Sequence, residues 1–135
     1  MRRAVLDPNV LVSALLNPTG TPGTLLTQAD GAGFELMLSP LVLEELEVVL
    51  LRKKFRRYVT VEEVGDFLAF VGRLGTLVPD SKLRAPRSSQ DPNDDYLLAL
   101  AYSQKAVLVS GDSHLLEIGG GAPICAPADL IAALT

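Results

Sequence analysis

The stretch Val5-Leu6-Asp7-Pro8-Asn9-Val10 stands almost at the start of this 135-residue sequence. An apolar run that predicts a short buried strand over 3–6 ends there at a carboxylate, and residues 10–16 predict an apolar helix. Asp7 is therefore expected at the carboxyl end of the first strand, which is the edge where open α/β sheets bind ligands. We expect both the fold and the site to be organised around this edge.

The rest of the chain alternates helical and strand patterns. Helices are expected from 21 to 31 or 33 and over 40–53, 61–74, 94–104, 112–118 and 128–134. Strands are expected over 34–38, 76–78, 106–110 and 123–125, and the polar segment 80–93 is expected to be the longest loop. Thr60 and Glu63 have the spacing of a capping box, which places a helix start at Val61. Alternating strands and helices predict right-handed βαβ units, a mostly parallel sheet and an α/β fold.

Length and composition limit the class of protein. A chain of 135 residues without a linker predicts one domain over 1–135, and 48% hydrophobic residues without Trp predict an aliphatic core. A net charge of -4 excludes a general binder of polyanions, so nucleic acid would need a metal and a local basic patch. Cys125 is the only cysteine, which fits a reducing cytoplasm, and no apolar run approaches the length of a membrane span.

Further carboxylates are placed where they can reach the edge at Asp7. They are Glu45, Asp91, Asp94, Asp95 and Asp112. Each has an ordinary structural explanation, because Asp7 and Asp112 can cap helices and Glu45 can extend to solvent from a helix edge. Together they supply only oxygen ligands, which suit Mg²⁺ or Mn²⁺ rather than zinc. A single His114 and a lone Cys125 do not make a convincing nucleophile set.

Four blocks of the sequence carry a resemblance to a known family. They are residues 5–13 (VLDPNVLVS), 39–46 (SPLVLEEL), 91–101 (DPNDDYLLALA) and 108–116 (LVSGDSHLL). In this order they resemble the PIN-domain nucleases, and most closely the toxin-like, VapC-type members of bacterial toxin–antitoxin pairs. The resemblance implies a PIN-like three-layer α/β/α fold with a mostly parallel central sheet.

The resemblance also implies a function. Members of the family cut RNA with Mg²⁺ or Mn²⁺, and toxin members are held inactive by a small antitoxin and often form dimers or higher oligomers. The matching acids here are Asp7, Glu45, Asp95 and Asp112. Asp7, Asp95 and Asp112 would hold the first ion, with Glu45 as a further ligand or as the base for the attacking water. The supporting residues would be Asn9, Ser13, Asp91, Ser110 and His114.

Two positions depart from the family pattern. Pro8 stands where the family usually has Thr, which removes a hydroxyl and a backbone N–H near the site. His114 stands where many members carry another acid, and a histidine there can still contact metal or phosphate. These departures leave open an alternative, a PIN-like module that binds protein or RNA with weak or no catalysis.

A basic run follows the helix expected over 40–53. It consists of Arg52, Lys53, Lys54, Phe55, Arg56 and Arg57. It can hold an RNA backbone or an antitoxin, or it can simply be a solvated helix end. A less favoured function is a phosphoryl-transfer domain of receiver or haloacid-dehalogenase type. The latter needs a second Asp where Asn9 stands, and a receiver needs an acid pair and a late Lys that are missing.

Overall fold

Strand β1 (Arg3–Leu6) is the central strand of the sheet in the computed structural model of this protein, which describes residues 2–81, 95–112 and 123–134. The other strands are β2 (Glu35–Leu38), β3 (Thr76–Leu77), β4 (Val107–Val109) and β5 (Ile124–Cys125). The five strands lie in the order β3-β2-β1-β4-β5, and every neighbouring pair is parallel. The expected parallel sheet is confirmed.

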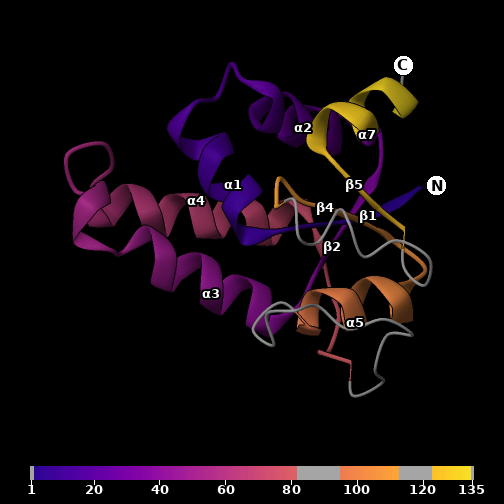
Figure 1. Ribbon diagram of the computed structural model, residues 1–135. Helices are drawn as coiled ribbons and strands as arrows, with labels where there is room; N and C mark the ends of the chain where they lie inside the picture. The colour runs from indigo at the N-terminus through magenta and orange to yellow at the C-terminus, as the bar shows by residue number, and fades with distance from the viewer. Residues whose placement is uncertain (1, 82–94, 113–122, 135) are drawn as a thin grey trace.

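Helices cover both faces of this sheet. They are α1 (Pro8–Leu16), α2 (Thr21–Asp30), α3 (Pro40–Leu50), α4 (Val61–Leu74), α5 (Asp95–Gln104) and α7 (Pro127–Leu134). In Figure 1, α1, α2 and α7 lie above the sheet, α5 lies below it, and α3 and α4 form a hairpin that extends to the left. The architecture is the three-layer α/β/α arrangement that the resemblance implies. No helix in the described ranges is long and apolar enough to cross a membrane.

The burial of the central strands is typical of a parallel sheet covered on both faces. Ala4, Val5 and Leu6 of β1 are all buried, as are Leu108 and Val109 of β4. Strands with apolar side chains on both faces need helices above and below, and parallel strands are connected through such helices. The register pairs Leu6 with Val109, so β1 and β4 end side by side at the carboxyl edge of the sheet.

Two helix starts show how the sequence sets the local structure. Helix α1 begins at Pro8, two residues earlier than expected, because proline suits the first helical position and Asp7 caps the helix. Helix α4 begins at Val61, as predicted. Thr60 accepts a bond from the backbone N of Glu63, and the Glu63 side chain accepts one from the backbone N of Thr60.

The expected end of α3 is wrong. The helix ends at Leu50 rather than at Lys53, and a short 3₁₀ helix, η1 (Lys53–Phe55), follows it. Arg52 is extended, with ψ of 139°, so the chain leaves the helix before the basic run. The Arg56 guanidinium donates to the carbonyl oxygen of Leu50 and so satisfies one of the free carbonyls at the helix end. The helix expected over 112–118, except for Asp112, and most of the loop expected over 80–93 lie outside the described residues.

Candidate active site

Asp7 lies at the point where β1 ends and α1 begins. Its backbone N donates to the carbonyl oxygen of Val109 on β4 at 2.9 Å, which continues the ladder between the two strands. Its side chain turns back to cap α1, and Oδ1 accepts a hydrogen bond from the backbone N of Asn9 at 3.0 Å. Only 6% of the residue is exposed. The carboxylate is therefore fixed and largely removed from water.

Ser110 connects this carboxylate to the end of β4. The fully buried Ser110 hydroxyl donates to Oδ2 of Asp7 at 3.0 Å, and the Ser110 Oγ itself accepts from the backbone N of Asp112 at 3.0 Å. A serine hydroxyl can donate and accept at once, so one side chain orders both aspartates. The two strand ends thereby bring two acids together from opposite halves of the sequence.

The electrostatics of Asp7 favour a bound cation. Burial raises the pKa of the Asp7 carboxyl, and the nearby Asp112 charge raises it further, while the hydrogen bonds from Asn9 and Ser110 partly lower it. Among the residues described, no lysine, arginine or histidine forms an ion pair with Asp7. A buried carboxylate is expensive without a charge partner. Two neighbouring acids with only oxygen donors suit a hard divalent cation such as Mg²⁺ or Mn²⁺.

A cavity of about 370 Å³ opens beside these acids. It is lined by Asp7, Asn9, Val10, Ser13, Pro22, Gly111, Asp112 and Pro127. Asn9 and Ser13 are four residues apart on α1, so they present their side chains on one face of the helix. The structure thus brings Asp7, Asp112, Asn9 and Ser13, all predicted as site residues, to one cavity.

Glu45 and Asp95 do not line this cavity. Asp95 is the first residue of α5, which runs back from the carboxyl edge towards the start of β4. The hydroxyl of Tyr96, the next residue, donates to Oε2 of Glu45 on α3. In the described ranges, no three or more acids, histidines or cysteines are grouped closely enough to hold a metal ion. Asp7 and Asp112 thus lie together at the cavity, whereas Glu45 lies beside the first turn of α5, which Asp95 begins.

Tyr96 and Asp80 are functional candidates that the sequence reasoning missed. Oδ2 of Asp80 accepts from the backbone N of Leu41 at 3.0 Å and, with the Ser39 hydroxyl, caps the helix that carries Glu45. Asp80 follows a short predicted strand, as Asp7 does, so an acid after a strand was the sequence signal that could have identified it. Nothing local pointed to Tyr96, because its partner is 51 positions away.

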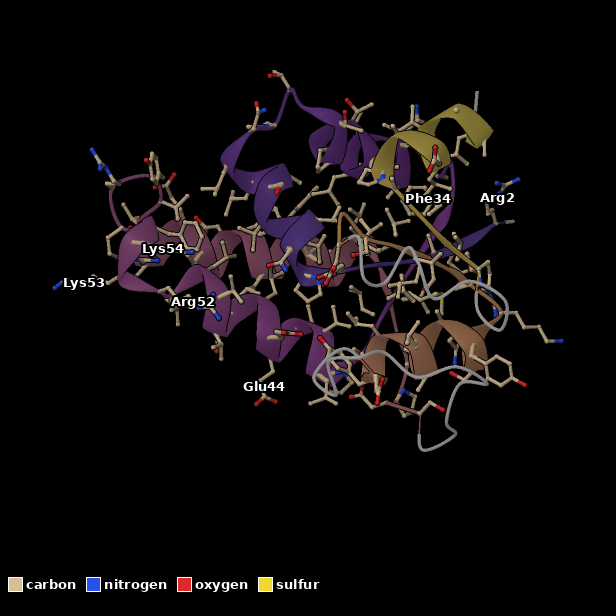
Figure 2. All side chains as sticks on the ribbon, in the orientation of Figure 1. Arg2, Phe34, Glu44, Arg52, Lys53 and Lys54 are labelled. Atoms are coloured by element: carbon tan, nitrogen blue, oxygen red, sulfur yellow. The ribbon has the colours of Figure 1, made fainter. Side chains whose placement is uncertain are left out.

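The basic run lies at the end of the α3–α4 hairpin, away from the sheet. Figure 2 shows Arg52, Lys53 and Lys54 there, and Glu44 pointing out from α3. Arg56 differs from the others because its guanidinium turns inward to Leu50, whereas Arg57 is exposed. Asp91, Asp94 and His114, also predicted for the site, lie outside the described residues.

Comparison with protein families and sequences places the chain among known proteins. Residues 3–114 match the family model described as "PIN domain". An uncharacterized protein of Methanocaldococcus jannaschii, MJ1680, is 29% identical over 118 residues, which cover 86% of this chain and 74% of that protein.

Solved structures share the fold at low sequence identity. VapBC2 from Rickettsia felis, bound to a promoter DNA fragment, superposes with a TM-score of 0.69 at 16% identity, covering 92% of this chain and 98% of that one. DNA-bound VapBC from Salmonella typhimurium gives 0.67 at 15% identity, covering 94% and 99%. PAE2754 from Pyrobaculum aerophilum gives 0.65 at 16% identity, covering 98% and 96%.

Proposed function

This chain belongs to the PIN-domain family, and we propose that it is a metal-dependent endoribonuclease, the toxin of a toxin–antitoxin pair. The observation that carries the proposal is the Asp7 carboxylate. It is buried, held by Ser110 and the backbone of Asn9, and placed beside Asp112 without a cationic partner in the described chain. Burying an unpaired carboxylate lowers the stability of the metal-free fold, and the same arrangement is suited to binding a divalent cation.

The ion would be Mg²⁺ or Mn²⁺. Asp7 and Asp112, which line the cavity, would hold it; Asp95, which lies outside the lining, is proposed as the third ligand on the family resemblance. When bound, it supplies positive charge that stabilises the phosphate as negative charge develops on it during hydrolysis.

Side chains of this protein would orient the phosphate and the attacking water and would accept the proton. Asn9 and Ser13 line the cavity and would hydrogen-bond the phosphate or the attacking water. Glu45, which does not line the cavity, is proposed on the family resemblance as the group that takes the proton of that water. Its Oε2 is occupied by the Tyr96 hydroxyl, and its Oε1 makes no hydrogen bond within the described ranges. The Tyr96 bond would therefore hold one carboxylate oxygen still while the other accepts the proton.

Cleavage of labelled single-stranded RNA tests this function. The parent protein is expected to cut in Mg²⁺ or Mn²⁺ and to stop in excess EDTA, whereas Asp7→Asn, purified identically, stays inactive in both. Asp30→Asn is a matched control, because Asp30 is exposed at the end of α2. Equal activity in the parent and in Asp7→Asn would assign the cleavage to a contaminant and reject the proposal.

A second candidate function is a PIN-like module that binds without cleaving. The observation in its favour is that Glu45 and Asp95 lie apart from the cavity that holds Asp7 and Asp112. Pro8 does not argue for it, because at the first helical position its missing N–H has no partner in the helix. RNA binding that persists without any metal-dependent cleavage distinguishes this module from the enzyme.

The partner we propose is a small antitoxin, as in the VapBC complexes that share the fold. Helix α3 supplies a surface for it. Leu41, Val48 and Leu51 are exposed at 41%, 57% and 44%, and their spacing puts them on one side of the helix. Apolar patches of this kind mark protein interfaces. Co-expression with the product of the neighbouring reading frame tests the pairing, and light scattering tests whether the chain alone forms the homodimer that we also propose.

A further inference from the structure

The end of the α3–α4 hairpin carries a dense positive charge. Five of the chain's 12 lysines and arginines stand within residues 52–57, and no acid occurs between Glu47 and Glu62. Four of these cations have exposed side chains: Arg52, Lys53, Lys54 and Arg57. None of the four forms an ion pair with any residue that the structure describes. On a chain whose net charge is -4, this run is a local surface for an anionic partner.

The fifth cation, Arg56, adds charge from below this surface. Its guanidinium turns inward and donates to the carbonyl oxygen of Leu50. Its Nε and Nη1 atoms are buried and have no hydrogen-bond partner, and no described acid pairs with it. The charge of Arg56 is therefore not neutralised within the described fold, and it raises the positive potential of the surrounding surface.

Tyr58 adds an aromatic ring to this surface. It follows the basic run directly and is 65% exposed, and the Arg57 guanidinium lies over its ring, 5.6 Å from the centroid. Likewise, Nζ of Lys54 lies 5.0 Å from the centroid of the half-buried Phe55 ring. Cations interleaved with rings are typical of surfaces that bind single-stranded nucleic acid, because the cations contact phosphates and the rings stack on bases. We call the basic run together with Tyr58 the hairpin tip.

Backbone hydrogen bonds fix the shape of the hairpin tip. The backbone N atoms of Tyr58 and Val59 both donate to the carbonyl oxygen of Phe55 at 2.9 Å, and that of Arg56 donates to the carbonyl oxygen of Lys53 at 3.1 Å. Val59 is buried and anchors the segment to the core. An exposed ring on a fixed backbone loses little conformational freedom when a base stacks on it.

We propose that the hairpin tip binds single-stranded RNA, with phosphates against Lys53, Lys54 and Arg57 and a base stacked on Tyr58. This inference rests on the proposed function, because it takes RNA as the substrate and adds a contact surface outside the cavity at Asp7. Helix α3 begins at the carboxyl edge of the sheet and ends at the tip, so its 11 residues separate the two places by roughly 16 Å. The tip therefore sets the affinity and position of the strand, and takes no part in the chemistry.

Fluorescence anisotropy with the full chain and a labelled 12-nucleotide oligouridylate, in EDTA, tests binding without cleavage. Tyr58→Ala should weaken binding about fivefold or more, whereas Tyr58→Phe keeps the ring and should bind like the parent. Tyr58→Leu keeps apolar area without a planar ring and should be as weak as Tyr58→Ala. Tyr102→Ala, exposed on α5, is the matched control. Parent-like affinity of Tyr58→Ala or Tyr58→Leu overturns the stacking contact.

Other anions of the same length test whether the ligand is RNA. An abasic phosphate chain keeps the charge without bases, so it should bind the parent more weakly than oligouridylate, and Tyr58→Ala should not weaken it further. Polyglutamate of 12 residues stands for an acidic protein segment, and displacement of RNA by it as readily as by unlabelled oligouridylate rejects the proposal. Preference for the oligodeoxyuridylate assigns the tip to single-stranded DNA and rejects it as well.

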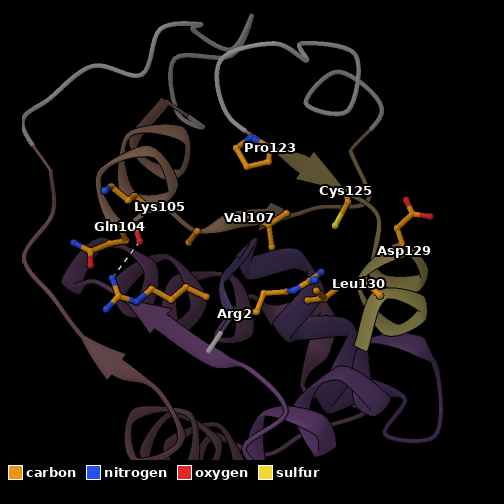
Figure 3. A pocket seen from close by; sticks show the side chains of 11 residues that line it. Arg2, Gln104, Lys105, Val107, Pro123, Cys125, Asp129 and Leu130 are labelled. Atoms are coloured by element: carbon orange, nitrogen blue, oxygen red, sulfur yellow. Dashed lines mark hydrogen bonds between the residues drawn. The ribbon is translucent and has the colours of Figure 1, made fainter. Parts of the chain in front are cut away.

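Lysine acetylation read by mass spectrometry locates the bound strand. Oligouridylate should slow the acetylation of Lys53 and Lys54 severalfold and leave Lys105 unchanged. Lys105 is the matched control because it is exposed and lines a separate cavity where β4 begins, beside Gln104 in Figure 3. Equal protection of Lys105, or no protection of Lys53 and Lys54, places the strand elsewhere and rejects the site.

Cleavage kinetics separate this inference from the proposed function. In Mn²⁺, Tyr58→Ala should raise KM about fivefold with kcat unchanged, because it removes binding that does not change during the reaction. Asp7→Asn should bind oligouridylate like the parent and not cut it. Binding without cleavage by the parent rejects the nuclease and keeps the hairpin tip. Cleavage by Tyr58→Ala with an unchanged KM rejects the hairpin tip and keeps the nuclease.

Discussion

The Ser110 hydroxyl donates to Oδ2 of Asp7 at 3.0 Å, although 103 positions separate the two residues. The bond joins the ends of β1 and β4 and also fixes Asp112, whose backbone N donates to the same hydroxyl oxygen. Much of the candidate site therefore depends on one buried serine.

Removing this hydroxyl should damage both stability and the site. Ser110→Ala leaves the buried Asp7 carboxylate with one hydrogen bond, and we expect a loss of roughly 1–3 kcal/mol of unfolding free energy at neutral pH. The pKa of Asp7 should rise further, because the Ser110 bond lowers it. Urea unfolding measures the loss. Ser103→Ala is the control, since among the described residues the Ser103 hydroxyl bonds only to the Leu100 carbonyl within α5, and its loss should change stability little.

Neutralising Asp7 should stabilise the metal-free protein at neutral pH. Its folded-state pKa is raised above 3.8, chiefly by burial, so the folded state holds a proton that the unfolded state loses first. The stability of the parent should fall as pH rises from 3.8 through that raised pKa, by about 1.4 kcal/mol per pKa unit of difference. Asp7→Asn keeps the cap and removes this dependence. As pH rises, the unfolding free energy of the parent should therefore fall relative to that of Asp7→Asn. If the two unfolding free energies change with pH in parallel, the folded protein does not hold a buried charged Asp7.

Tyr96 should matter for catalysis more than for folding. Tyr96→Phe removes the hydroxyl that holds Oε2 of Glu45, and we expect RNA cleavage to slow by about tenfold with a near-parent melting temperature. Tyr102→Phe, on the same helix but exposed, is the matched control. If Tyr96→Phe and Tyr102→Phe cleave RNA at the same rate, the Tyr96 hydroxyl does not position Glu45 for catalysis.

Within the basic run, Arg56 should contribute to stability, whereas the other cationic residues should contribute to RNA binding. Arg56→Ala removes the bond to the Leu50 carbonyl and should destabilise by about 1 kcal/mol, whereas Arg57→Ala should not. Changing Lys53, Lys54 and Arg57 together to Ala should weaken RNA binding and reduce its logarithmic salt slope by about 2, at roughly 0.7 per lost phosphate contact. An unchanged slope in filter-binding measurements would exclude this run from RNA contact.

The sequence predicts most of the fold because its signals are local. The change from an apolar strand to Asp7 and Pro8, and the Thr60–Glu63 capping box, each appear within a few residues. The predicted end of α3 is wrong because the chain becomes extended at Arg52, and the Leu50 carbonyl is bonded by Arg56, which lies beyond the helix. The site was less predictable for the same reason. Residue types and positions predict Asp7 and Asp112 as site residues, and the structure places the two together, but the contacts of Tyr96 and Asp80 connect distant segments that no local pattern relates.

The central claim is that Asp7, Asp95 and Asp112 form a site for Mg²⁺ or Mn²⁺. Thermal melts with increasing Mn²⁺ test it most directly, on the parent, Asp7→Asn and Asp95→Asn. We expect the parent to gain stability as RT ln(1 + [Mn²⁺]/Kd), about 2.7 kcal/mol at a hundredfold excess over Kd. Both variants should lose most of that gain, although metal-free Asp7→Asn melts at or above the parent temperature. Variants that respond to Mn²⁺ as fully as the parent would contradict the metal site.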